Sequence, residues 1–135
     1  MNHHDAQQLL DQLHRAQNEF YAGGDVGPVA ALLTCDVHWS VPGDTVIAGD
    51  YHGVAAVLAY LERRRRLADG TLRLVRRDVL VGHGRHVAAI TDAVAVRAGQ
   101  VLTWTSVGLY AVQGARIQRC WLLPLDTAGF DDLWS

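Results

Sequence analysis

The pattern of apolar and polar positions divides the chain into a helical first part and a strand-rich second part. One stripe of apolar residues recurs at helical spacing and predicts a buried helix face: Leu9, Leu13, Ala16 and Phe20. This first helix should end at the glycine pair 23–24, because glycine tolerates the left-handed conformation of a helix end. A short second helix should follow to about residue 33, and a third should span residues 53–70.

The second part of the chain has the pattern of antiparallel strands joined by tight turns. Period-two alternation, interrupted by short segments that contain glycine, predicts strands at residues 71–81, 86–97, 101–113 and 116–123. Residues 37–43 alternate in the same way and stop at a Pro-Gly pair, so we expect a short edge strand there and an irregular loop over 44–52. Helices first and a strand meander last predict an α+β fold, with room for a small molecule between sheet and helices.

Composition and charge restrict the classes of protein. The chain has 135 residues, half of them apolar, which fits one domain over residues 1–135. Its formal net charge is −2 and its basic residues are scattered, so we expect no nucleic-acid partner. No apolar run is long enough to span a membrane, so a cytoplasmic location is expected. Residues 1–5 should be flexible, and the tail, residues 125–135, should dock on the sheet.

Cysteine and histidine do not form a recognisable metal or disulfide pattern. Cys35 and Cys120 lie among apolar neighbours and are predicted to be small, buried, unpaired side chains. His83 and His86 have the spacing of a ligand pair, but a turn separates them and no carboxylate or thiolate is close in sequence. We therefore expect no metal and no other cofactor.

Four consecutive arginines, residues 63–66, lie toward the end of the third predicted helix. Cations in the last turns complement the negative end of the helix dipole and keep that end solvated. Arg64 is the exception, because it follows Tyr60 by four residues and could lean toward the rim of a pocket. A substrate carboxylate would suit it there.

Asp92 is the candidate catalytic residue. It lies in residues 87–96, a run otherwise too apolar to have a wet face. An aspartate in such a strand must be hydrogen-bonded or face a cavity, where burial would raise its pKa and suit it to act as a general base. The alternative is that Asp92 faces solvent on the outer side of the sheet, or bonds a neighbouring Thr or Arg.

The following strand also carries candidate pocket residues. Its alternation predicts that four side chains share one face: Trp104, Ser106, Gly108 and Tyr110. A hydroxyl between aromatic rings is common in ligand pockets, although it is also ordinary in a half-buried strand.

Several local sequences resemble the nuclear transport factor 2-like superfamily, and within it the SnoaL-like proteins. They are residues 21–25 (Tyr-Ala-Gly-Gly-Asp), 37–43, 47–53, 120–126 and 130–134. The resemblance implies a cystatin-like cone, in which a strongly curved, mainly antiparallel sheet wraps around three N-terminal helices and encloses a pocket. It also implies a homodimer formed through the outer face of the sheet.

The resemblance carries over few functional residues. Ketosteroid isomerases use an aspartate base and two oxyanion donors, and the matching positions here are Val41, Gln17 and Ser106. Limonene epoxide hydrolases use one arginine and two aspartates, of which only Asp92 is matched. SnoaL-type cyclases need little more than one acid/base residue in an apolar pocket, and Asp92 could serve.

The sequence therefore favours a cofactor-independent enzyme that acts on a small apolar or polyketide-like molecule by general acid/base chemistry. Such an enzyme would be a cyclase, a dehydratase or an isomerase, with Asp92 as the catalytic residue. The candidate substrate-binding residues are Gln17, Tyr21, Trp39, Val41, Tyr60, Trp104 and Ser106. The alternatives are a non-catalytic ligand-binding or dimeric interaction module, and an epoxide hydrolase-like hydrolase.

Overall fold

The computed structural model describes residues 1–135, except for the side chain of Leu133. Six strands form one sheet in the order β2-β1-β6-β5-β4-β3. The elements in chain order are α1 (His3–Tyr21), α2 (Gly27–Ala30), β1 (Leu33–Val41), β2 (Gly49–His52), α3 (Val54–Leu67), β3 (Arg73–Val81), β4 (His86–Arg97), β5 (Gln100–Gln113), β6 (Arg116–Pro124) and α4 (Thr127–Trp134). β1 and β6 run parallel, and the other neighbouring strands run antiparallel.

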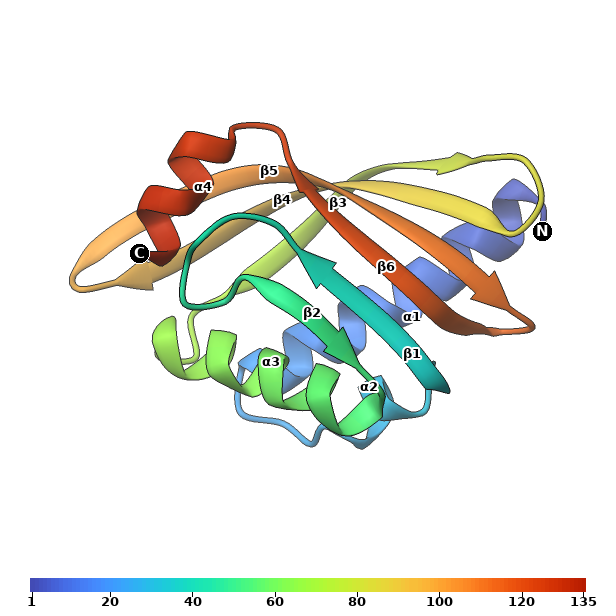
Figure 1. Ribbon diagram of the computed structural model, residues 1–135, viewed down its shortest axis with the longest axis horizontal. Coiled ribbons are helices and arrows are strands. Elements are labelled where there is room, and N and C mark those ends of the chain that lie inside the picture. Colours follow the sequence, from blue (N-terminus) through green and yellow to red (C-terminus); the bar gives the residue numbers. More distant parts are fainter.

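The sheet is curved, and α1 and α3 lie along its concave face (Figure 1). α1 packs against β3, at one edge of the sheet, while α3 packs against β1 and β2 at the other edge. The two long helices thus bridge the sheet and enclose the space beneath its central strands. α4 lies beside the turn between β4 and β5, at the opposite end of the molecule from Met1 (Figure 1).

The helices differ from expectation at both ends of the chain. α1 begins at His3, because the side chain of Asn2 accepts a hydrogen bond from the backbone N–H of Asp5 (2.8 Å) and caps the first turn. Residues 3–5 are therefore helical, where a flexible segment was expected. The expected number of three helices is also wrong, since α4 is a fourth and α2 is a single turn. None of the described helices combines the length and the apolar character needed to cross a membrane.

The predicted edge strand is also wrong. β1 is an interior strand between β2 and β6, and β2 takes the edge. β2 forms within the segment expected to be an irregular loop, where Trp39 pairs with Tyr51 and Val41 pairs with Gly49. A four-residue strand that contains glycine and aspartate has little β propensity of its own. β2 forms because it pairs with β1 in the folded protein, and the local sequence does not predict this pairing.

Consecutive residues of β4 alternate between the concave face and the outer face of the sheet. The inward-facing set is buried and consists of Val87, Ala89, Thr91, Ala93 and Ala95. Their partners in β5 lie on the same inner face, and they include all four residues predicted to share a face: Trp104, Ser106, Gly108 and Tyr110. The predicted face of β5 is confirmed.

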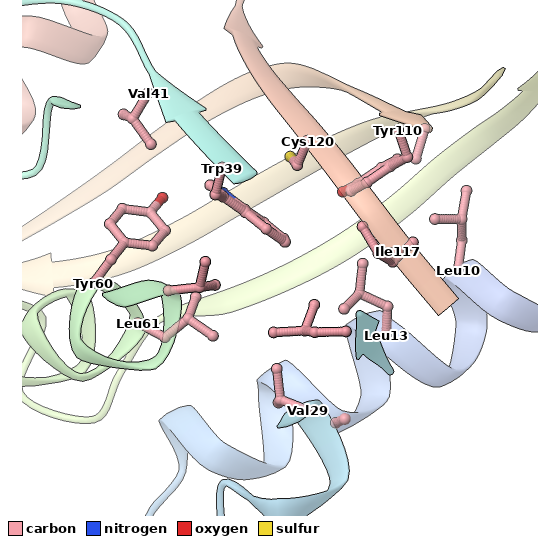
Figure 2. Close-up of a cluster of buried hydrophobic side chains, with 14 of the residues drawn as sticks. Leu10, Leu13, Val29, Trp39, Val41, Tyr60, Leu61, Tyr110, Ile117 and Cys120 are labelled. Atoms are coloured by element: carbon pink, nitrogen blue, oxygen red, sulfur yellow. The ribbon is translucent and has the colours of Figure 1, made fainter. Parts of the chain in front are cut away.

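The core fills the space between the two long helices and the sheet. Figure 2 shows Leu13 of α1, Tyr60 of α3 and Trp39 of β1 directed into this space. Both cysteines are free: Cys120 is buried, as expected, but Cys35 is exposed. The prediction for Cys35 is wrong because the register of β1 against β6 shifts between Leu33 and His38, which leaves Cys35 outside the core.

Candidate functional site

A small cavity of about 30 Å³ lies beneath the central strands. Its lining comes from both long helices and from the inner face of the sheet: His14, Gln17, Trp39, Arg64, Leu74, Thr91, Ala93, Trp104, Ser106, Gly108, Tyr110 and Leu122. This volume has room for roughly one or two water molecules. No aspartate or glutamate among the described residues lines it.

Four polar atoms of the cavity lining are buried without a hydrogen-bond partner among the described residues. They are His14 Nδ1, Trp39 Nε1, Arg64 Nε and Ser106 Oγ. Most buried polar side-chain atoms in folded proteins are satisfied, so such a group gathered around one cavity requires an explanation. Water or a ligand in the cavity would supply the missing partners, which makes this the candidate functional site.

His14 brings a titratable group to the cavity from α1. It lies four residues after Leu10 and three before Gln17, so it falls on the buried stripe of the helix. Burial, together with repulsion from Arg76, lowers the pKa of His14 to about 4, and the nearby Asp11 only partly opposes this. The imidazole is therefore neutral at pH 7, and one ring nitrogen is able to accept a proton.

Arg64 brings a permanent positive charge from α3. Its side chain is only 4% exposed, and Nη1 donates a hydrogen bond to the hydroxyl of Tyr21 (3.2 Å). The guanidinium carbon lies 5.7 Å from the ring centre of Tyr21, 5.5 Å from that of Tyr60 and 5.7 Å from that of Trp134. These are cation–π distances, so aromatic faces hold the charge where a carboxylate usually does.

Aromatic side chains form the wall between Arg64 and the sheet. The rings of Trp39 and Tyr110 meet edge to face at 6.2 Å, and Trp39 lies 6.4 Å from Tyr60. Gly108 makes this packing possible, because a Cβ there would come within 2.6 Å of the Tyr110 hydroxyl. Burial raises the pKa of both Tyr60 and Tyr110, so both phenols stay protonated and remain hydrogen-bond donors.

α4 packs against Trp104, one of the residues that line the cavity. Trp134 is 2% exposed and meets Trp104 edge to face at 5.5 Å, and Phe130 meets the same ring at 6.3 Å. The indole Nε1 of Trp134 is buried and has no partner among the described residues. The ring of Trp134 thus lies next to the guanidinium of Arg64.

The predicted substrate-binding residues are distributed around this cavity in three ways. Four of them line it: Gln17, Trp39, Trp104 and Ser106. Tyr21 and Tyr60 contact Arg64 and hold its side chain. Val41 is buried in the core but is not among the lining residues.

Asp92 does not face the cavity, and the expectation that it points inward is wrong. Thr91 takes the inward position on β4, so Asp92 lies on the outer face, opposite Thr105 and Val75. Arg77 binds both carboxylate oxygens (2.9 and 2.6 Å), and Thr105 donates to one of them (2.6 Å). These bonds, that of Arg77 first, lower the pKa of Asp92. The carboxylate is therefore ionised and satisfied, as the alternative interpretation proposed.

Asp92 borders a wider groove of about 700 Å³ on the exposed flank of β5, which is open to solvent. Val75, Val101 and Phe130 contribute to its mainly apolar lining. An ionised, ion-paired carboxylate at an open surface is a weak base. The groove therefore offers less chemistry than the smaller cavity.

Sequence reasoning missed His14, whose only signal was its place on the buried stripe of α1. It found Arg64 by the same kind of argument, from the spacing to Tyr60. The other histidines do not line the cavity; His38 stacks on His52 with ring centres 3.8 Å apart. No group of three or more metal-binding side chains occurs among the described residues.

Comparisons with known proteins place the chain among SnoaL-like folds. The model of the SnoaL-like domain family matches residues 14–120. An uncharacterized protein of Mycobacterium tuberculosis is 34% identical over 126 residues, which cover 93% of this chain and 95% of that protein.

Solved structures extend the likeness over nearly the whole chain. Bal32a, from a soil-derived mobile gene cassette, matches with a TM-score of 0.85 and 25% identity, over 97% of this chain and 99% of its own. TerC, co-crystallized with polyporic acid, matches with a TM-score of 0.77 and 19% identity, over 96% and 97%. A candidate polyketide cyclase of Xanthomonas campestris pv. campestris matches with a TM-score of 0.75 and 20% identity, over 100% of both chains. The last two likenesses concern the fold alone.

Proposed function

This chain belongs to the SnoaL-like domain family, as its resemblance indicated, and we propose that it catalyses a cofactor-independent proton transfer on a small organic molecule inside the cone. One observation carries the proposal: His14, Trp39 and Ser106 each have a buried polar atom without a partner among the described residues, and all three line a single cavity. A few convergent polar groups in an apolar hollow are the usual form of a small-molecule site.

His14 takes the role of general base that the sequence had given to Asp92. Its neutral imidazole accepts a proton from a carbon next to a carbonyl group, and the electrons of the C–H bond move onto the carbonyl oxygen. The hydroxyl of Ser106 and the indole N–H of Trp39 donate hydrogen bonds to the oxyanion that forms. Protonated His14 then returns the proton.

The fate of the enolate distinguishes the reactions that this arrangement supports. Return of the proton to a different carbon gives an isomerisation. Attack of the enolate on a second carbonyl closes a ring, and the proton then goes to the alkoxide that forms. Return of the proton to a departing hydroxyl gives a dehydration. Each needs one base and oxyanion donors, with no metal or nucleotide, so all three stay within the cyclase, dehydratase and isomerase classes. Epoxide hydrolysis loses support, because its one matched residue, Asp92, lies outside the cavity.

A substrate needs more space than this cavity provides. Ligand sites commonly measure roughly 300–1,000 Å³, whereas this cavity measures about 30 Å³. Displacement of Trp134 with α4 would join the cavity to the space beside Trp104. We therefore expect substrate entry to require movement of α4.

A second candidate function, a non-catalytic binding module, is favoured by the electrostatics of His14. A base with a pKa of about 4 attracts protons weakly at pH 7, and no described carboxylate assists it from the cavity wall. Such a module would bind the same class of small molecule and release it unchanged.

Replacement of His14 by Gln separates the two candidates. The protein is incubated with a panel of small aromatic ketones and diketones, products are followed by mass spectrometry, and binding is followed by tryptophan fluorescence. For a compound that is converted, we expect H14Q to lower kcat by ~10²- to 10⁴-fold while the dissociation constant is unchanged. His83→Gln, on the exposed turn between β3 and β4, is the matched control. Unchanged turnover in H14Q would refute the role of His14, and binding without any conversion would favour the module.

A further inference from the structure

Arg64 is a buried cation without a counter-ion. Among the described residues no carboxylate forms an ion pair with it. Its three arginine neighbours in the sequence differ from it in being at least partly exposed. Removing a charge from water is costly unless the charge is paired and hydrogen-bonded. The three aromatic rings and the Tyr21 hydroxyl offset part of that cost but leave Nε without a partner.

The surroundings of Arg64 are rich in hydrogen-bond donors and poor in negative charge. Trp39 Nε1 and Ser106 Oγ, both buried and unpartnered, line the same cavity. Tyr60 adds a phenol whose oxygen is also unpartnered. With no described carboxylate in the lining, the cavity presents a net positive charge to any guest. A neutral ligand would leave the positive charge of Arg64 uncompensated, whereas an anionic ligand would neutralise it.

The shape of the surroundings favours a flat guest. Rings of Trp39, Tyr110 and Trp104 line the cavity beside Arg64, and Trp134 lies against its guanidinium. Trp134 is itself a flat aromatic group whose N–H finds no partner in this position. The ring of Trp134 lies beside Arg64 without accepting a hydrogen bond from the guanidinium. A ligand ring could therefore replace it without breaking such a bond.

We propose that Arg64 is the anion-binding subsite of the cavity and that it takes the carboxylate, or the equally acidic enol, of a flat aromatic ligand; the proposal rests on the proposed function only in sharing its cavity. The ligand's ring replaces that of Trp134, and its two oxygens accept hydrogen bonds from the guanidinium fork. Arginine suits this role because its donors match the two oxygens of a carboxylate.

A purely structural role for Arg64 makes a different prediction. In that case the guanidinium only joins α1, α3 and α4 through Tyr21, Tyr60 and Trp134. Its replacement would then loosen the fold and weaken binding of charged and neutral ligands alike. Selectivity between an acid and its neutral isostere therefore distinguishes the two roles.

The test uses 2-naphthoate and 2-naphthamide, which share size and shape and differ in charge. Calorimetric titration of the full chain should show that the acid binds more tightly than the amide by at least about tenfold. Arg64→Met should remove this preference, whereas Arg66→Met, in the same helix but with a side chain 72% exposed, should keep it. Circular dichroism checks that each variant folds.

Equal binding of acid and amide to the unaltered protein, or binding of neither at millimolar concentration, would overturn the proposal even if R64M does not fold. The proposed function fails separately. Acid-selective binding without turnover of any panel compound would refute the enzyme and leave the anion site standing. Turnover that depends on His14 but shows no preference for acids would do the reverse.

Discussion

On the outer face of the sheet, Asp92 accepts three hydrogen bonds from Arg77 and Thr105, whereas beneath the sheet Arg64 has one hydroxyl and three rings. Asp92 lies in an apolar segment and Arg64 in a run of four arginines, and both were candidates for chemistry. The outer charge is satisfied by its neighbours and needs no ligand. The inner charge has no counter-ion in the described part of the chain. A missing partner for a buried polar group is therefore a better guide to function than the residue's position in the sequence.

The comparison of the two faces is tested most strongly by placing the same charge on each. Ala89 faces the core and is fully buried, while its neighbour Ala88 faces outward. We expect Ala89→Asp to lower the free energy of unfolding by about 3–5 kcal/mol, because the new carboxylate is buried without a partner. Ala88→Asp should cost less than about 1 kcal/mol. Urea unfolding measures the free energy of unfolding of both variants. Similar losses would mean that the two faces are equally exposed to solvent.

Removal of the inner charge should have a much smaller effect on stability. Removal of an unpaired buried charge relieves its desolvation cost, whereas Arg64→Met also loses cation–π contacts worth about 2 kcal/mol or more each when desolvated. We expect these effects to offset one another to within about 1 kcal/mol in urea unfolding. A loss of roughly 3 kcal/mol or more would show that Arg64 mainly holds the helices together.

Removal of the outer charge should have the smallest effect, and the effect should depend on pH. The folded-state pKa of Asp92 is lowered by Arg77 and Thr105, so its contribution to stability is present above the unfolded pKa, about 4. It is lost as the pH falls through the folded value. Asp92→Asn should therefore unfold slightly more easily than the unaltered protein at pH 7, and the difference should vanish near pH 2. A difference that grows at low pH would contradict the assigned ion pair.

The hairpins were predictable because their signals are local. Short breaks with glycine end each strand, and the predicted bounds of β4 are those of the structure. The inner face of β5 followed from the alternation that leads from Trp104 to Tyr110.

The site was only partly predictable because its decisive features are not local. Both faces of β4 carry small apolar residues, so alternation alone could not decide which face held Asp92. The irregularity of β3 between Arg76 and Asp78, which accompanies the contact between Arg77 and Asp92, has no marker in the sequence. That Arg64 lacks a counter-ion could be known only once α1, α3 and α4 had been placed around it.

The parallel pairing of β1 with β6 has a consequence for the order of folding. Trp39 pairs with Cys120, a partner 81 positions along the chain, whereas β3 to β6 pair through short turns. Contacts between distant segments form slowly because a long loop must close first. The hairpins can thus assemble early, while β1, which carries Trp39, pairs with β6 late. A ligand of the cavity would bind only the fully folded protein. Its binding would therefore raise the free energy of unfolding.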